Sequence, residues 1–109
     1  MIEKLLGSKS SENVLLFLTA FEEGYAREIA FFYGTSLNVI QKQLAKLEDA
    51  GVIVSTMKGR TKLYVWNPRY PFLKEFQMFL RKVFLYLPEE TAEKYQQSRR
   101  RPRRSDKRL

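Results

Sequence analysis

Residues 24–66 contain the pattern that most constrains the fold of this 109-residue chain. The apolar spacing within residues 26–30 predicts a short helix. Gly34 follows it, and glycine adopts the left-handed backbone of a turn at little steric cost. Ser36 is a candidate N-cap, because its hydroxyl can accept a hydrogen bond from a free amide in the first turn of the next helix. The pattern therefore predicts two helices joined by a tight turn.

The second of these helices is expected to be amphipathic and to end at Gly51. Its apolar stripe consists of Leu37, Ile40, Leu44 and Leu47. The opposite side and its flanks carry Asn38, Val39, Gln41, Lys42, Lys46 and Asp49. Amide and short polar groups near the start of an exposed helix suit a helix that enters the major groove of DNA. Taken alone, the same pattern also fits an ordinary solvated surface helix.

A β-hairpin with a basic tip is predicted next. Residues 52–57 are rich in β-branched side chains, residues 61–66 return in strand-like alternation, and Gly59 supplies the positive φ of the bend. The tip carries Lys58, Arg60 and Lys62. These charges either keep an exposed sheet edge soluble or reach phosphates and the minor groove of a duplex.

In their order, these elements resemble a known family. Arg-Glu-Ile-Ala at 27–30 and Gly-Thr-Ser-Leu-Asn-Val-Ile-Gln-Lys-Gln-Leu-Ala-Lys-Leu-Glu-Asp-Ala-Gly-Val-Ile at 34–53 look like the helix-turn-helix core of ArsR-like and MarR-like winged-helix repressors. Lys-Gly-Arg-Thr-Lys-Leu-Tyr at 58–64 resembles their wing. With the flanking helices the resemblance covers roughly residues 5–87. It implies a mainly α fold with a small β-hairpin, a winged helix-turn-helix with N- and C-terminal dimerisation helices, and double-stranded DNA as the partner.

Two departures from the family pattern stand out. Tyr25 occupies a position where the family favours Ser or Thr, so only Glu28 is left to complete half of a capping box. Many ArsR-like proteins sense metals through Cys or His, and this sequence contains neither residue. We therefore expect no metal site.

Two apolar helices flank the central pattern. Residues 13–21 are apolar nearly all round, which fits either a central core helix or a helix shared with a second subunit. Residues 72–87 carry an apolar surface wider than one face of a small domain can cover. We expect a homodimer whose interface includes Leu15, Leu16, Phe72, Phe76, Phe79, Val83 and Tyr86.

The net charge of +8 is concentrated at the C-terminus. Residues 98–109 contain seven Lys or Arg and one Asp, whereas residues 1–97 contain 13 basic and 11 acidic side chains. The sequence thus predicts a winged-helix domain over residues 1–97 and a disordered arginine-rich tail over residues 98–109. The tail can bind a polyanion, but its charge does not support a basic recognition face on the domain.

Composition argues against several other classes of function. Without histidine or cysteine, the chain lacks the usual general base near neutral pH, a nucleophilic thiol and the common transition-metal ligands. The glycines are scattered and form no phosphate-binding loop. We expect no catalytic residue, no cofactor and no enzyme activity. No apolar run of about 18 residues is present, so we expect no membrane partner and a cytoplasmic, nucleoid-associated protein.

These observations predict a DNA-binding transcriptional regulator, a repressor rather than an activator. The predicted DNA-binding residues are Ser36, Asn38, Val39, Gln41, Lys42, Lys46, Lys58, Arg60 and Lys62. Two alternatives stay open. One is a protein-interaction module, for example the partner of a nucleotidyltransferase-type enzyme, since similar wing domains with Asn-Pro-Arg-Tyr-Pro connectors occur beside such enzymes. The other is RNA binding through the basic tail. The sequence names neither an operator nor a small-molecule or protein effector.

Overall fold

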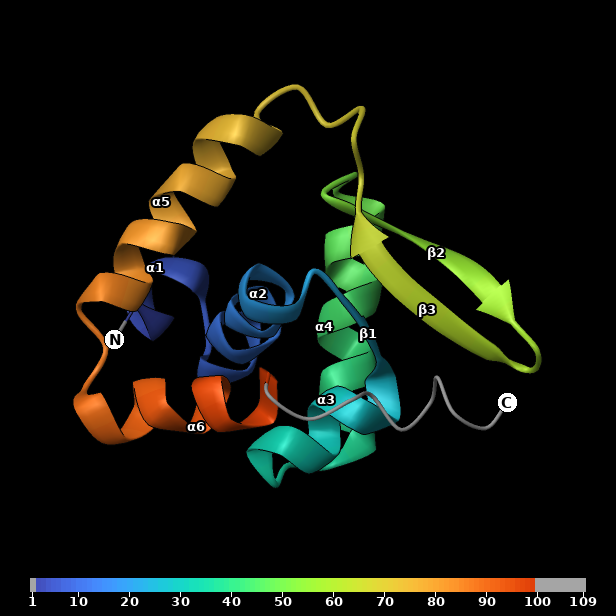
Figure 1. The fold of residues 1–109 in the computed structure, drawn as a ribbon. Coiled ribbons are helices and arrows are strands. Elements are labelled where there is room, and N and C mark those ends of the chain that lie inside the picture. The colour runs from blue at the N-terminus through green and yellow to red at the C-terminus, as the bar shows by residue number, and fades with distance from the viewer. Residues whose placement is uncertain (1, 100–109) are drawn as a thin grey trace.

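The structure is a computed structural model that describes residues 2–99. Six helices and three strands alternate along these residues (Figure 1). In chain order they are α1 (Glu3–Leu6), α2 (Lys9–Phe21), β1 (Glu23–Tyr25), α3 (Ala26–Tyr33), α4 (Leu37–Asp49), β2 (Ile53–Lys58), β3 (Thr61–Trp66), α5 (Leu73–Leu85) and α6 (Glu89–Arg99).

Helix α2 is the central element of the fold. One side of it packs with α3, α4 and the sheet, in an apolar cluster that includes Val14, Phe17 and Leu18. The other side packs with α5 and α6 in a second cluster, built from Leu15, Leu16, Ala20, Leu80, Val83 and Tyr95. A helix that is apolar nearly all round needs cover on more than one side, and here one chain supplies it.

This arrangement corrects part of the predicted dimer interface. Leu15 and Leu16 are each only 2% exposed, because α5 and α6 of the same chain cover them. Val83 is buried in the same cluster, and Phe76 is half-buried with its ring 6.4 Å from that of Trp66. These four side chains belong to the intramolecular core, so they are removed from the predicted interface. The remaining three, Phe72, Phe79 and Tyr86, are exposed.

The sheet contains one more strand than the predicted hairpin. Its order is β1-β3-β2, and both pairings are antiparallel. The additional strand is β1, which pairs with β3 so that Gly24 lies opposite Tyr64. The backbone of Gly24 lies so near the ring of Phe17 that an added Cβ would be 2.7 Å from Phe17 Cε1. Glycine therefore allows β1 to pack directly against the central helix.

The helix ends agree with the capping chemistry of the sequence. The hydroxyl of Ser8 accepts a hydrogen bond from the amide of Ser11 at the start of α2. At the start of α3, the Tyr25 amide donates to the Glu28 carboxylate at 3.2 Å, which is the predicted half of a capping box. Helix α6 continues to Arg99 and thus into the predicted tail, which begins at residue 98. The rest of that tail, residues 100–109, lies outside the described residues.

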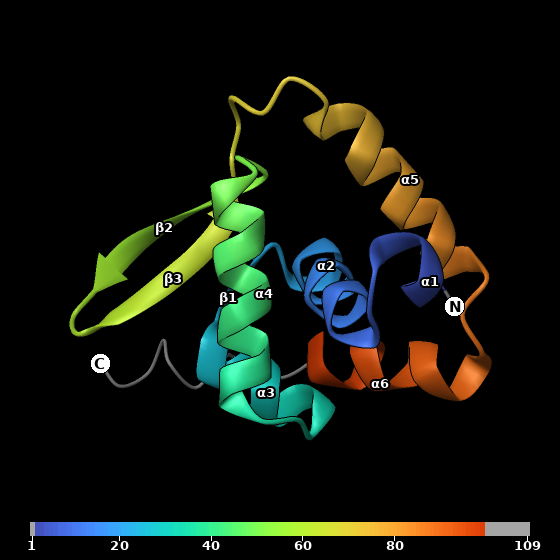
Figure 2. The same cartoon turned by 180° about the vertical axis from the view of Figure 1, so that it is seen from behind.

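The fold is a winged helix, as expected. Helices α3 and α4 form the helix-turn-helix, and the β2–β3 hairpin is the wing that projects beside them (Figure 2). Within residues 2–99, none of the helices combines the length and the apolar character needed to span a lipid bilayer.

Candidate nucleic-acid interface

Helix α4 is held by its apolar side and by its N-terminus. Ile40 and Leu44 are fully buried against the core, which fixes the opposite side of the helix outward. Ser36 is the N-cap, and its Oγ accepts a hydrogen bond from the Val39 amide at 3.3 Å. On the flank, Ser11 of α2 donates from its hydroxyl to Gln43 Oε1 at 2.7 Å. The rotation of α4 about its axis is therefore set by the packing of its apolar side and by the hydrogen bond from Ser11 to Gln43.

The outward side of α4 and its N-cap carry six of the nine predicted DNA-binding residues, and the other three lie on the wing. The exposed positions on and just before this helix are Ser36, Asn38, Val39, Gln41, Lys42, Ala45, Lys46 and Asp49. They recur at intervals of three and four residues, so they form one continuous face. In the described part of the chain no other element covers this face.

The turn before α4 is made by Gly34. Its φ of 65° lies in the left-handed region, and the amide of Thr35 donates back to the Ala30 carbonyl at 3.0 Å. This C-terminal cap of α3 brings the chain sharply around into Ser36. Glycine at this position is what allows two short helices to meet at the angle of a helix-turn-helix.

The wing is a tight hairpin with a charged tip. Lys58 pairs with Thr61, which leaves Gly59 and Arg60 as a two-residue turn. Of these two, only Gly59 has a positive φ, at 66°. This is the pattern of a type II′ turn, in which glycine occupies the first central position. Lys58, Arg60 and Lys62 are all exposed. Three positive side chains therefore gather within a few residues at the end of the hairpin.

A side-chain hydrogen bond joins the wing to α4. The Ser55 hydroxyl on β2 donates to Glu48 Oε2 at 2.9 Å. At the base of the wing, the Asn67 side-chain amide donates to the Gly51 carbonyl at 2.8 Å, and the Trp66 indole donates to the Leu18 carbonyl at 3.1 Å. These bonds fix the hairpin relative to both α4 and the central helix. The spacing of Glu48 and Ser55 along the chain carries no signal for their pairing, which depends on the tertiary packing of α4 against β2.

Charge is distributed unevenly over the domain. Residues 1–97 have a net charge of only +2, yet five of their 13 basic side chains are those of α4 and the wing. Arg27, at the start of α3, is a sixth exposed cation of the helix-turn-helix. Tyr64 on β3 of the wing adds no negative charge at neutral pH, since burial, followed by the negative charge of Glu48, raises its pKa further above the usual value near 10. The nearly neutral domain thus presents a locally basic surface.

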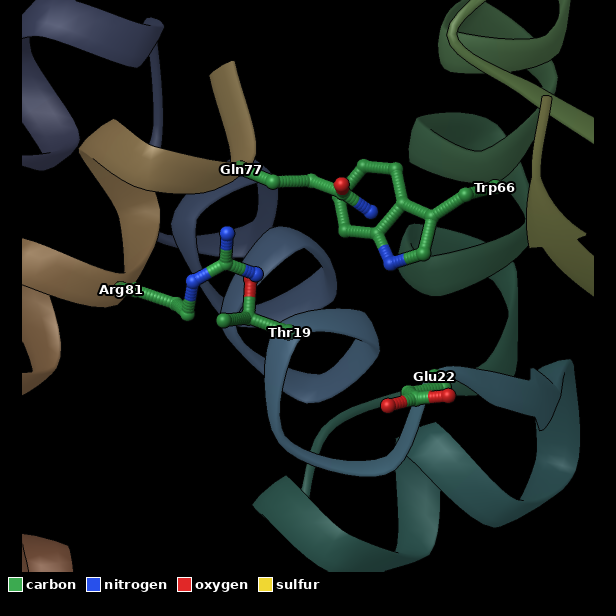
Figure 3. A pocket seen from close by; sticks show the side chains of 5 residues that line it. All are labelled: Thr19, Glu22, Trp66, Gln77 and Arg81. Atoms are coloured by element: carbon green, nitrogen blue, oxygen red, sulfur yellow. The ribbon is translucent and has the colours of Figure 1, made fainter. Parts of the chain in front are cut away.

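A small polar pocket lies elsewhere, between the C-terminal end of α2, the end of β3 and α5 (Figure 3). It is lined by Thr19, Glu22, Trp66, Gln77 and Arg81 and has a volume of about 210 Å³. Ligand pockets usually measure about 300 to 1,000 Å³, so this one is small for a metabolite. Among residues 2–99 no group of three or more acidic side chains is placed to hold a metal ion. The α4 and wing surface is therefore the candidate functional site.

A helix-turn-helix followed by a wing defines the chain as a winged-helix protein. Solved structures of mutants of ZitR from Lactococcus lactis share this fold. A mutant with one substitution is 20% identical to this chain with a TM-score of 0.52, and the match covers 79% of this chain and 66% of that one. A mutant with two substitutions, in its apo form, is 22% identical with a TM-score of 0.53, and the match covers 90% and 71%. The chain thus spans about two thirds of the ZitR chain. No protein-family model and no curated protein sequence matches it.

Proposed function

We propose that this chain is a sequence-specific double-stranded DNA-binding transcriptional regulator that acts as a dimeric repressor. One observation carries the proposal: the polar side of α4 is exposed along its whole length and lies beside a basic wing. In this arrangement α4 enters the major groove, and the wing reaches the backbone or the adjacent minor groove. The absence of histidine and cysteine from the sequence supports a binding protein rather than an enzyme.

Each exposed side chain of α4 has a chemistry that suits a base edge or a phosphate. The amides of Asn38 and Gln41 match the donor and acceptor pattern of adenine, and Lys42 matches the acceptors of guanine. Val39 offers a methyl-sized apolar contact for thymine. Ser36 and the free amides behind it suit a phosphate, and Lys46 lies further along the same side.

The wing supplies contacts that do not depend on sequence. Lys58, Arg60 and Lys62 would neutralise phosphates on either side of the groove that α4 enters. Arginine at the tip would gain further from the negative potential of a narrow minor groove. The basic side chains of residues 100–109, which lie outside the described residues, would add affinity of the same kind.

A second copy of the chain is expected to complete the DNA-binding unit. Phe72, Phe79 and Tyr86 on α5 and at its two ends are exposed aromatic side chains, which support a homodimer. A two-fold dimer reads a pseudo-palindromic site whose half-sites are separated by about 10 base pairs or a multiple of that number. Such a protein works in the cytoplasm, on the nucleoid.

Selection of bound sequences from a random pool of duplex DNA by the full chain tests the proposal. We expect an inverted repeat to be enriched. Lys42→Ala should relax base preference at one position in each half-site, with a loss of about 1 to 3 kcal/mol in discrimination. The matched control is Lys74→Ala, which removes an exposed lysine from α5 and should leave the selected sequence unchanged.

Deletion of residues 100–109 separates this proposal from its rivals. If the shortened chain still selects the same duplex sequence, α4 and the wing carry recognition. If it binds no duplex DNA and the full chain prefers structured RNA, the function belongs to the basic tail. If neither chain binds nucleic acid, the exposed apolar side chains of α5 favour a protein-interaction module.

A further inference from the structure

The outer side of α5 is an apolar surface that no described element covers. Five large apolar side chains are exposed on it, and their exposed fractions are 63% for Phe72, 56% for Met78, 39% for Phe79, 80% for Leu85 and 66% for Tyr86. Glu75 and Lys82 are exposed on the same side, one turn before Met78 and one turn after it. The inner side of the helix, with Leu80 and Val83, is buried against α2. We name the exposed set the outer face of α5.

Apart from Tyr86, the outer face of α5 is symmetric about the bond between Met78 and Phe79. Glu75 precedes Met78 by three residues, and Lys82 follows Phe79 by three. Phe72 and Leu85 lie three residues farther out on the two sides. An apolar position therefore mirrors an apolar one, and an acidic position mirrors a basic one.

This symmetry has a direct physical meaning for two copies of the helix. In an isologous contact, residue i of one copy meets residue j of the other, and j meets i in return. An antiparallel pair centred on the Met78–Phe79 bond brings Met78 against Phe79 of the second copy and Phe72 against its Leu85. Glu75 then faces Lys82 twice, once on each side of the two-fold axis.

We infer that the outer face of α5 binds a second copy of this chain as an antiparallel helix pair, in the register set by the Glu75–Lys82 contacts. This inference rests on the proposed homodimer and specifies its geometry. Neither Glu75 nor Lys82 forms an ion pair with another residue in the range 2–99, so both charges are available to a partner.

Charge rules out the neighbouring arrangements. In a parallel pair, Glu75 faces Glu75 and Lys82 faces Lys82, and like charges in contact are destabilising. An antiparallel pair that is slid by one turn loses both charge pairs, because Glu75 and Lys82 then face apolar side chains. A slide of two turns centres the pair on one of the charged residues, which then faces its own copy. Because α5 is about 20 Å long, the contact is small, and its few charged positions therefore have a large influence on register.

The place of α5 in the fold is compatible with DNA binding by both copies. In Figures 1 and 2 α5 lies at the edge of the molecule opposite the wing, with α2 between it and α4. A second copy bound to the outer face of α5 leaves α4 and the wing of each subunit free.

Charge exchange at the two positions tests the inference. Sedimentation equilibrium over a range of protein concentrations measures the dimer dissociation constant. It is applied to the full chain, to Glu75→Lys, to Lys82→Glu and to the doubly substituted form. Lys74→Glu is the control, because it makes a matched charge change on α5 at a position whose mirror, Val83, carries no charge. Thermal unfolding of each variant confirms that the exposed substitutions leave the fold intact.

Each single exchange places like charges together twice in the dimer, so we expect its dissociation constant to rise about tenfold or more. The double exchange restores opposite charges and should return the constant to within about threefold of the original. Glu75→Lys mixed with Lys82→Glu should form a heterodimer in preference to either homodimer, because the exchanged charges are then distributed between two different chains. Lys74→Glu should have little effect.

Two results would overturn the inference in different ways. If the unsubstituted chain dimerises and its dissociation constant is the same in all four variants, another surface joins the subunits. The proposal of a dimeric regulator would then be unaffected. A chain that stays monomeric at every concentration, with or without DNA, would overturn the homodimer itself. Selection of duplex DNA is an independent readout, so recognition by α4 is judged separately.

Discussion

The hydroxyl oxygens of Tyr33 and Tyr95 lie 2.7 Å apart, in a hydrogen bond that joins α3 to α6 across 62 positions of the sequence. The ring of Tyr95 also lies 5.2 Å from that of Phe32 and 4.9 Å from that of Phe84. Lys94 Nζ lies 4.7 Å from the centre of the Phe32 ring, in a cation–π contact. The C-terminal helix is thereby attached directly to the helix-turn-helix.

Replacing one of these two tyrosines by phenylalanine should destabilise the fold. The remaining buried hydroxyl loses its partner, and an unpaired buried polar group costs about 1 to 3 kcal/mol. Tyr33→Phe combined with Tyr95→Phe should cost less than the sum of the two single changes, because neither hydroxyl is then left unpaired. Urea unfolding of the four proteins measures this coupling. Strict additivity would show that the hydrogen bond contributes nothing.

The same pair predicts a loss of stability in alkali. Burial is the main cause that raises the pKa of Tyr95 to about 12, and burial also raises the pKa of Tyr33. Unfolded tyrosines ionise near pH 10, so above that pH the unfolded state releases protons that the folded state retains. The stabilisation is complete below about pH 10 and is lost as the pH rises toward 12. The doubly substituted protein should show a shallower fall in unfolding free energy over this range.

Gly24→Ala should destabilise the domain by about 1 to 3 kcal/mol. The new Cβ would lie 2.7 Å from Phe17 Cε1, and the Phe17 ring is buried among the rings of Phe21, Phe32 and Tyr33. The ring therefore has little room to move aside. Thermal unfolding measures the cost. In a Phe17→Leu background the shorter side chain should reduce the penalty, and an unchanged penalty would locate the strain elsewhere.

Ser55→Ala should loosen the wing. It removes the donor to Glu48 and should cost about 1 kcal/mol in unfolding free energy. If the wing contacts DNA, its affinity for the selected duplex should also fall severalfold, because the hairpin must then be ordered on binding. Glu48→Gln is the matched control, since its side-chain oxygen still accepts from Ser55. Fluorescence anisotropy on the labelled duplex gives the affinity, and equal effects of the two changes would count against this role.

Arg60→Ala and Lys62→Ala should weaken binding to all duplexes by similar factors. If each of these side chains contacts one phosphate, as we propose, its removal should reduce the slope of log affinity against log salt concentration by about 0.9. Titrations at several salt concentrations measure this slope. A change in which sequences are preferred, with the slope unaltered, would assign these side chains to base reading instead.

Sequence patterns are sufficient where local chemistry decides the structure. The apolar stripe through Ile40 and Leu44 correctly predicts which side of α4 is buried, and Gly34 and Gly59 correctly mark the two turns. Strand β1 is three residues long and forms because β3 presents an open edge to it, so no periodicity predicts it.

The assignment of Leu15 and Leu16 to a dimer interface is wrong, although the periodicity of their helix is interpreted correctly. Periodicity shows that a helix needs cover on several sides, but it does not show whether its own chain or a second one provides that cover. Here α5 and α6 provide it. The mirror arrangement of Glu75 and Lys82 is visible in the sequence, but it has meaning only once the structure shows which side of α5 remains open.

The hydrogen bond between Glu48 and Ser55 also affects how a duplex would be chosen. With α4 and the wing held together, the two elements that we propose to enter neighbouring grooves keep a fixed separation. A rigid pair of this kind would bind more tightly to duplexes whose grooves already have the matching separation, and less tightly to those that must be deformed to fit. Base pairs that no side chain touches would then contribute to the choice of site through the stiffness of the double helix.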